Sequence, residues 1–183
     1  MNLSAIILRL FGWTLIGDYT HIKKSVVVMA PHTSNWDFVI GKLYLSAMGM
    51  NNHTLMKKEA FFFPLNHLLT FLGAIPVDRK NKAESLVQQA SNRIKKSKEF
   101  NIFIAPEGTR KLNKRWKKGF FYIAQEANVP IALSYVDYKK KEVGIAKIIK
   151  ETNKIEDVMK EINEFYKNIT PKYPESFVLD NRY

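Results

Sequence analysis

Two patterns of hydrophobic and polar positions alternate along the chain. Short continuous apolar runs predict strands, and longer stretches with apolar residues three or four positions apart predict helices. Strands are expected at 25–30, 53–58, 74–78, 101–105, 130–138 and 141–150, and helices at 37–48, 59–73, 83–100, 116–127 and 156–168. Because the two kinds of element alternate, the pattern predicts an α/β fold, with a central, largely parallel or mixed sheet flanked by helices.

The first residues have an amphipathic pattern that predicts an N-terminal helix at about 3–16. Its apolar residues at helical spacing are Leu3, Ile6, Ile7, Leu10 and Phe11. No apolar stretch reaches the roughly 20 residues of a membrane-spanning helix, and the segment lacks the features of a signal peptide. The apolar stripe suits either docking on the protein's own core, which we favour, or a membrane interface with Trp13 at headgroup level.

The composition predicts one globular domain over residues 1–183. Of the 183 residues, 46% are hydrophobic, which excludes intrinsic disorder, and no linker or repeat interrupts the pattern. The absence of cysteine excludes disulfide scaffolds, thiolate nucleophiles and Cys-ligated zinc. A formal net charge of +12 predicts an anionic partner, either nucleic acid or an acidic membrane surface.

The first candidate for chemistry is the block PHTSNWDF, between a predicted strand and a predicted helix. On one continuous helix His32 and Asp37 would point about 140° apart. They can meet only if His32 lies in the loop and Asp37 in the first helical turn, where the carboxylate would orient a general base. The alternative is a capping box made by Ser34 and Asp37, with His32 an ordinary loop residue.

Two further blocks follow predicted strands. In FIAPEGTR, Gly108 allows close approach of the backbone to a ligand, and Arg110 offers a planar fork that suits phosphate. In GAIPVDRKN, Arg79 stands at another strand end, where Asp78 can pair with it. The alternatives are a solvated turn for the first block and a surface ion pair for the second.

Taken in order, the blocks HTSNWD, GAIPVDR, PEGTR and VPI resemble the 1-acyl-glycerol-3-phosphate acyltransferase family of glycerolipid acyltransferases. The resemblance extends from residue 31 to about 131. It implies an O-acyltransferase that moves a fatty acyl group from a thioester to a hydroxyl of a lysophospholipid or glycerol-phosphate-type acceptor. The co-substrate would be acyl-CoA or acyl carrier protein, with no further cofactor. The spacing of the four histidines matches no zinc-binding motif, so no metal is expected.

The resemblance also implies roles for individual residues. His32 would be the general base and Asp37 the residue that orients it, in a direct transfer without an acyl-enzyme. The residues that it assigns to substrate binding are Arg79, for the acceptor phosphate, and Glu107, Gly108, Thr109 and Arg110. Trp36 and Ala105 depart from the residues usual in the family, which affects the substrate pocket but leaves the catalytic pair intact.

These roles predict a geometry. A ring nitrogen of His32 should lie about 2.6 to 3.2 Å from an Asp37 carboxylate oxygen, or somewhat further without substrate. The side chains of Arg79, Glu107 and Arg110 should converge with His32 on one pocket mouth, because the phosphate of the acceptor must be held near the base.

Two surface features suggest a partner. Residues 61–73 are apolar enough to line an acyl groove or touch lipid, or to form a buried core helix, and residues 110–118 carry six cations around Trp116. Together they favour a cytoplasmic protein bound peripherally to the anionic inner face of a membrane, with no nucleic-acid partner. The alternative function is a non-catalytic domain that binds either nucleic acid, using Trp116, Phe120, Phe121 and Tyr122, or a lipid surface.

Overall fold

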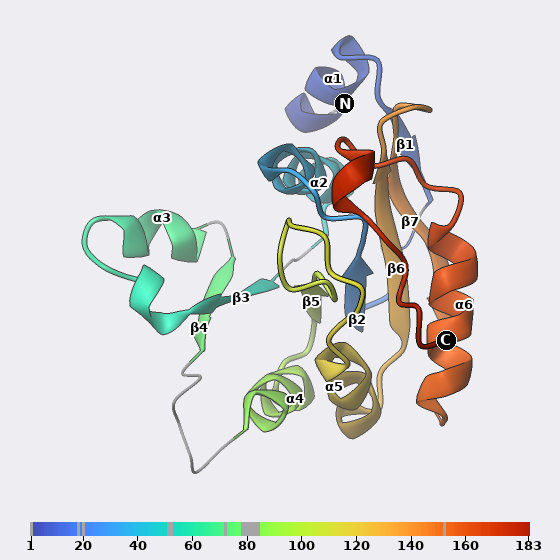
Figure 1. Cartoon of the computed structure of the whole chain (residues 1–183). Coiled ribbons are helices and arrows are strands. Elements are labelled where there is room, and N and C mark those ends of the chain that lie inside the picture. Colours follow the sequence, from blue (N-terminus) through green and yellow to red (C-terminus); the bar gives the residue numbers. More distant parts are fainter. Residues whose placement is uncertain are drawn as a thin grey trace.

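The computed structural model describes residues 2–17, 19, 21–50, 53–71, 73–77, 85–151 and 153–183. Within these residues a seven-stranded sheet has the order β1-β7-β6-β2-β5-β3-β4 (Figure 1). The strands are β1 (Thr14–Ile16), β2 (Lys24–Met29), β3 (His53–Lys57), β4 (Ala74–Val77), β5 (Phe100–Ile104), β6 (Ile131–Asp137) and β7 (Glu142–Ile149). Neighbouring strands pair in parallel, except β6 and β7, which pair antiparallel. The predicted α/β class with a mixed, largely parallel sheet is confirmed.

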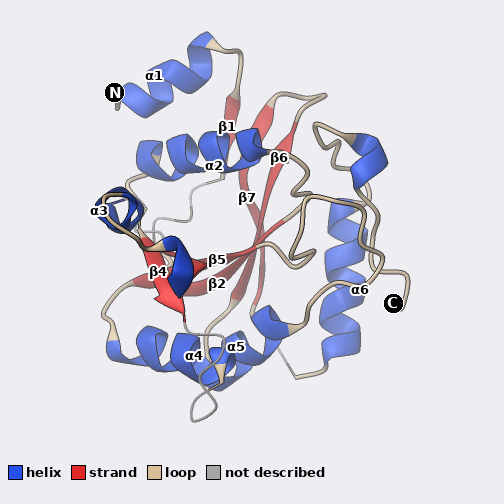
Figure 2. Cartoon of the chain, turned by 60° about the vertical axis from the view of Figure 1, so that its left-hand side comes forward, coloured by secondary structure: helices blue, strands red, loops and turns tan. Residues whose placement is uncertain are grey.

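Helices cover both faces of the sheet (Figures 1 and 2). They are α1 (Leu3–Leu10), α2 (Asn35–Ala47), α3 (Leu65–Phe71), α4 (Leu86–Lys96), α5 (Gly119–Ala127) and α6 (Ile155–Tyr166). The segments Lys58–Ala60 and Pro174–Ser176 form 3₁₀ helices. Helices α1 and α2 lie on one face, α4, α5 and α6 lie on the other, and α3 lies beyond the β3–β4 edge.

The central strands are apolar on both faces because helices bury both. Successive side chains of a strand point to opposite faces. Val26 and Val28 of β2 therefore pack in the core formed with α4, α5 and α6, whereas Val27 packs in the core formed with α1 and α2. This burial explains why β2 has a continuous apolar run rather than an alternating one.

The predicted N-terminal helix at 3–16 is wrong in its second half. Helix α1 ends at Leu10, Gly12 takes a left-handed conformation with φ of 78°, and Thr14–Ile16 forms β1 beside β7. The predicted docking on the core is confirmed, since α1 packs against α2 and Leu8 is fully buried. The predicted apolar stripe is only partly the docking face: Leu3, Leu10 and Phe11 are exposed.

Other boundaries differ for local reasons. The predicted helix at 83–100 occupies only 86–96, because Ser85 forms a capping box with Gln88 at its start and Phe100 belongs to β5. The predicted helix at 116–127 begins only at Gly119, and the preceding Trp116 is held by its N–H, which donates to the Asp180 carboxylate. Helix α3, within the predicted helix at 59–73, has no buried residue, so its interpretation as a core helix is wrong.

The topology brings three loops together. Strands β6, β2 and β5 are parallel neighbours at the centre of the sheet, so the loops after Met29, Ile104 and Asp137 meet at its carboxyl edge. In open α/β sheets ligands bind at this edge. The C-terminal segment also reaches it, since the Tyr173 N–H donates to Thr33 Oγ1 over 3.3 Å.

Candidate active site

The loop after β2 brings His32 and Asp37 together. Asp37 is buried in the first turn of α2, and its Oδ2 lies 3.4 Å from His32 Nδ1. This N···O contact is slightly longer than the predicted range and is not a hydrogen bond, so His32 Nδ1 lacks a hydrogen-bond partner within the described part of the chain. The two side chains nevertheless face each other, as a catalytic base and its orienting carboxylate require in a site without substrate.

The capping box predicted for Ser34 and Asp37 is confirmed. Asp37 Oδ2 accepts the backbone N–H groups of Thr33 and Ser34, each over 2.8 Å, and Ser34 Oγ accepts the Trp36 N–H over 3.1 Å. The carboxylate that faces His32 is thus also the one that starts the helix. The two interpretations of this block are therefore compatible.

The second oxygen of Asp37 contacts a residue that the sequence did not indicate. Tyr138, just after β6, donates its hydroxyl to Asp37 Oδ1 over 2.7 Å. Burial, together with the hydrogen bond to Asp37, raises the pKa of Tyr138 well above its usual value. The available signal was topological: β6 is a parallel neighbour of β2, so its carboxyl end lies beside the His32 loop.

Glu107 lies beneath the His32 loop. Its buried Oε1 accepts the backbone N–H of His32 over 2.8 Å, while its own carbonyl accepts the Asn113 side-chain amide over 2.7 Å. Burial raises the pKa of Glu107 to about 7, against the opposing effect of the hydrogen bond from His32. The carboxyl group thus links the loop after β5 to the loop after β2.

A cleft of about 800 Å³ opens beside His32. Its apolar lining comes from α4, β5 and α5, and its polar lining includes the three exposed residues Thr109, Arg110 and Lys117. The lining residues include His32, Leu86, Phe103, Ile104, Arg110 and Lys117. One wall thus suits hydrocarbon, and the rim carries cations.

Gly108 lets the loop after β5 pass close to Lys117. Its φ of 68° lies in the left-handed region, and a Cβ built there would be 2.8 Å from Lys117 Cε and 3.0 Å from Nζ. A side chain at this position would displace the lysine from the cleft. Gly108, Thr109 and Arg110 line the cleft beside His32, as predicted for Arg110. The predicted place of Glu107 at the pocket mouth is wrong, because its side chain is buried behind the cleft, where it accepts the His32 backbone N–H. Arg79 lies outside the described residues, so its position at the pocket mouth beside His32 stays a prediction.

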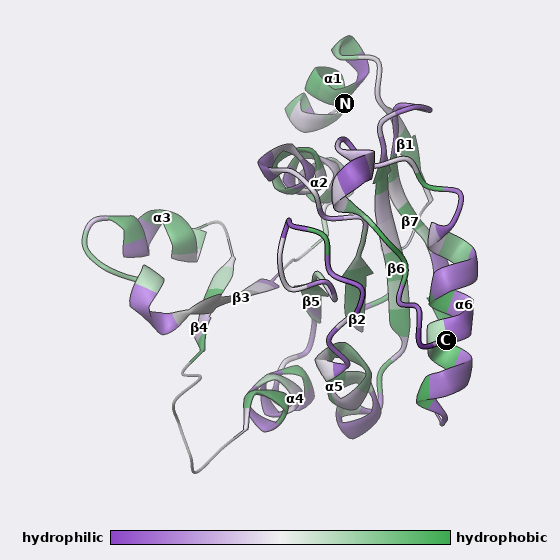
Figure 3. Ribbon diagram, in the orientation of Figure 1, coloured by the Kyte–Doolittle hydropathy of each residue, from purple (hydrophilic) through white to green (hydrophobic). Residues whose placement is uncertain are grey.

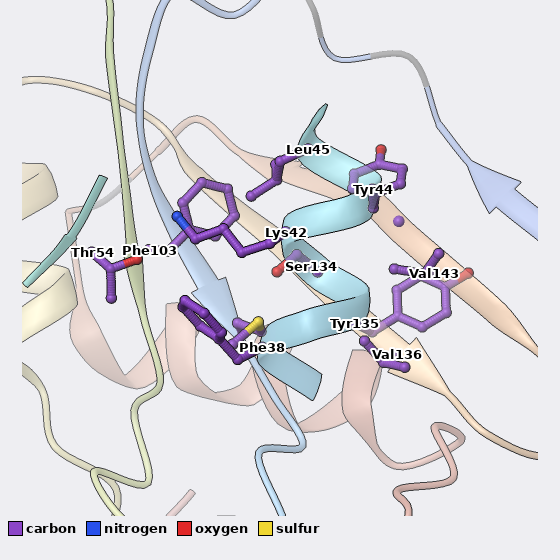
Figure 4. Close-up of a pocket in the computed structure, with 13 residues that line it drawn as sticks. Phe38, Lys42, Tyr44, Leu45, Thr54, Phe103, Ser134, Tyr135, Val136 and Val143 are labelled. Atoms are coloured by element: carbon purple, nitrogen blue, oxygen red, sulfur yellow. The ribbon is translucent and has the colours of Figure 1, made fainter. Parts of the chain in front are cut away.

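A second, smaller cavity lies between α2 and the sheet (Figure 4). It measures about 30 Å³, which is room for about one or two water molecules. Lys42 extends from α2 toward Thr54 and Phe103 in this view, and burial lowers the pKa of Lys42 to about 8. Thr54 and Phe103 also line the cleft beside His32, but the cavity contains neither member of the His32–Asp37 pair.

The basic run at 110–118 divides into an exposed and a buried part. Arg110, Lys111, Lys114, Arg115 and Lys117 are exposed, and Lys118 is half-buried. Trp116, Phe120 and Phe121 are buried in the core, where none of them can stack on a base. The aromatic component of the nucleic-acid interpretation is therefore wrong for these three residues. The described residues contain no group of three or more histidine, aspartate or glutamate side chains that could hold a metal ion.

Comparison with known proteins assigns the chain to a family. Residues 14–134 match the acyltransferase family. The chain is 26% identical over 125 residues to a Saccharomyces cerevisiae protein named 1-acyl-sn-glycerol-3-phosphate acyltransferase, covering 64% of this chain and 40% of the yeast protein. It is 37% identical over 84 residues to a Chlorobium chlorochromatii protein named tyrosine–tRNA ligase, covering 45% of this chain and 20% of that protein.

The chain therefore belongs to the acyltransferase family, and the predicted resemblance is confirmed. The prediction of an acyltransferase enzyme is thus confirmed at the level of the family. The chain spans about two fifths of the length of the yeast relative and one fifth of that of the other.

Proposed function

We propose that the chain transfers a fatty acyl group from an acyl thioester to a hydroxyl of a lysophospholipid or glycerol-phosphate-type acceptor, and so serves phospholipid biosynthesis. The observation that carries this proposal is the shared cleft. The His32 side chain, which faces the buried Asp37, opens into the same cleft as the exposed cations Arg110 and Lys117. A base beside a phosphate-binding rim suits an acceptor that carries both a hydroxyl and a phosphate.

In the proposed reaction His32 takes the proton of the acceptor hydroxyl as its oxygen attacks the thioester carbonyl carbon. Asp37 holds the ring and stabilises the imidazolium that forms. The tetrahedral intermediate then collapses, the C–S bond breaks, and the thiolate receives the proton from His32. The products are an ester and a free thiol, and the histidine returns to its neutral form.

Direct transfer is favoured over an acyl-enzyme. The chain contains no cysteine, and Ser34 Oγ accepts the Trp36 N–H at the start of α2. The reaction as proposed needs no metal or redox cofactor, and its co-substrate is acyl-CoA or acyl carrier protein.

The cleft offers separate environments for the two ends of the substrates. Phe103, Ile104 and Leu86 provide an apolar wall for hydrocarbon, while Arg110 and Lys117 face the anionic groups of acceptor and donor. Glu107 serves the acceptor indirectly in this proposal, by holding the His32 backbone. The role of Arg79 toward the acceptor phosphate remains part of the proposal on the strength of the resemblance alone.

A membrane surface is the proposed location of the acceptor. Among the helices of the described residues, none has the length and apolar character needed to cross a bilayer. Large apolar side chains are instead exposed on α1, on α3 and just before α3, and α1 and α3 project from the sheet on the side of α2 (Figures 1, 2 and 3). They are Leu3, Leu10, Phe11, Phe62, Phe63, Leu68 and Phe71.

The start of α2 adds an aromatic and cationic pair to this side. Trp36 is 55% exposed, and Lys172 Nζ lies 5.2 Å from the centre of its ring. Amphipathic aromatic rings and long cationic side chains both suit the headgroup layer of a membrane. In this proposal Trp36, which departs from the family pattern, contacts the headgroup layer of the membrane beside the His32 loop. The cytoplasmic location and the inner face of the membrane remain predictions.

Vesicle sedimentation tests the membrane part of the proposal. We expect binding to anionic vesicles that weakens but persists as salt rises, because salt screens charge but leaves apolar insertion intact. Replacing Phe63 and Phe71 by serine should remove the persistent part, since each buried phenylalanine contributes about 1.5–3 kcal/mol. Tyr122→Ser, at an exposed position of α5, is the matched control and should bind like the wild type. Unchanged binding of the double variant would contradict the proposal that Phe63 and Phe71 insert into the membrane.

The activity is tested with purified protein, one acyl thioester and a panel of lyso-acceptors and glycerol 3-phosphate. Mass spectrometry should detect an acylated acceptor, and free thiol should be released in equal amount. His32→Ala should abolish product formation while its circular dichroism and melting curve remain those of the wild type. Product formation by a folded His32→Ala variant would contradict the proposed mechanism.

A further inference from the structure

Tyr138 completes the set of contacts around the Asp37 carboxylate. Oδ2 faces His32 and accepts two backbone N–H groups, whereas Oδ1 accepts the Tyr138 hydroxyl over 2.7 Å. The two oxygens of the carboxylate are therefore held from opposite ends. Rotation of the carboxylate about its bond to Cβ would break the contact with Tyr138 and turn Oδ2 away from His32.

Tyr138 is itself held by elements remote from the His32 loop. Its backbone N–H donates to the Thr170 carbonyl over 2.9 Å, and its ring packs edge-on against Trp13 with 5.4 Å between centroids. Lys172 Nζ lies 6.0 Å from the ring centre. Trp13, Tyr138, Thr170 and Lys172 all lie outside residues 14–134, which match the acyltransferase family. The family match therefore gives no role to this part of the chain.

We infer that Tyr138 is a positioning residue for acyl transfer, which fixes the Asp37 carboxylate in the orientation that directs Oδ2 to His32 Nδ1. This inference rests on the proposed function of the His32–Asp37 pair. A hydroxyl that donates to a carboxylate forms a charge-assisted hydrogen bond, which is stronger than a neutral one. Without it, a buried carboxylate oxygen would lack a partner, and the carboxylate would gain rotational freedom.

The raised pKa of Tyr138 agrees with this role, because it keeps the hydroxyl protonated and therefore a donor to Asp37. The hydroxyl acts through Asp37, since its hydrogen bond is to that carboxylate and Tyr138 is not among the residues that line the cleft. Its removal should therefore slow the chemical step and leave acceptor binding unchanged.

Tyr138→Phe tests the inference, with Tyr135→Phe as a matched control. Tyr135 lies near the end of β6, three positions before Tyr138. Its hydroxyl also donates to a carboxylate, Glu142 Oε2, over 3.2 Å. We expect Tyr138→Phe to lower kcat by about tenfold to a hundredfold, the range for a hydrogen bond to a charged group, with acceptor KM unchanged. Tyr135→Phe should keep the wild-type kcat and KM. Wild-type kcat in a folded Tyr138→Phe variant would overturn the inference.

A double-mutant cycle with Asp37→Asn separates positioning from general destabilisation. If Tyr138 acts through the Asp37 carboxylate, Tyr138→Phe should cause little further loss in the Asp37→Asn background. The same fractional loss in both backgrounds would mean a merely structural role and would overturn the inference. The proposed function has a separate test, since full activity of His32→Ala would contradict it whatever Tyr138→Phe does.

Discussion

Glu107 should make the stability of the protein depend on pH in a way that one substitution removes. Its carboxyl group is buried, and its pKa is raised by burial to about 7, compared with an ordinary value of 4.5. The folded chain therefore binds a proton more tightly at Glu107 than the unfolded chain does. The stabilisation from this group is fully present below about pH 4.5 and is lost as the pH rises to about 7.

The magnitude follows from the two pKa values. The difference between about 7 and 4.5, at about 1.4 kcal/mol for each pH unit, corresponds to roughly 3 kcal/mol of unfolding free energy. Glu107→Gln removes the titration but keeps a side-chain oxygen that can accept the His32 N–H, now 2.8 Å from Glu107 Oε1. Glu107→Ala removes the acceptor as well and leaves that N–H without its partner, at a cost of about 1–3 kcal/mol.

Urea unfolding of the wild type and both variants, repeated from pH 4.5 to 8, measures the effect. The free energy of unfolding of Glu107→Gln should rise relative to the wild type by roughly 3 kcal/mol across this range, because all other titrating groups are shared. The Gln variant should also retain more acyltransferase activity than the Ala variant, because it still holds the His32 backbone. A difference between wild type and Glu107→Gln that stays constant with pH would contradict a raised pKa of Glu107 in the folded protein.

Two further predictions concern stability and substrate binding. Gly108→Ala should lower the free energy of unfolding by about 1–2 kcal/mol, since φ is 68° there, and should raise acceptor KM by displacing Lys117. An unchanged KM would exclude Lys117 from acceptor binding. Asp180→Ala should cost about 1–3 kcal/mol in urea unfolding, because the buried Trp116 N–H loses its acceptor. The exposed Glu175→Ala serves as its control, and equal losses would contradict the role of Asp180.

The sequence predicted the geometry of the His32 loop because its signals are local. An apolar strand, a cap residue and an aspartate three positions later determine where α2 begins, and they bring Asp37 back toward His32. The loop after β5 was predicted for a similar reason, since Pro106 and Gly108 follow a continuous apolar run. Short-range patterns of this kind suffice to place a residue at a strand end.

The rest of the site depends on contacts between distant segments. The hydroxyl of Tyr138 reaches Asp37 across 101 positions, and the inward direction of Glu107 is set by the His32 N–H, 75 positions away. A motif gives the place of a residue in a loop but not the direction of its side chain. Strand β1 was missed for the same reason, since its pairing with β7 is long-range and only three residues long.

We propose above that His32, oriented by Asp37, moves the proton of the acceptor during acyl transfer. The most direct measurement is the initial rate of acceptor-dependent thiol release by the wild type, His32→Ala and Asp37→Asn, each shown to be folded and to bind anionic vesicles equally. We expect release that requires the acceptor in the wild type, none above background in His32→Ala, and a strongly reduced rate in Asp37→Asn. Acceptor-dependent release by His32→Ala at the wild-type rate would contradict the role of His32 as the general base.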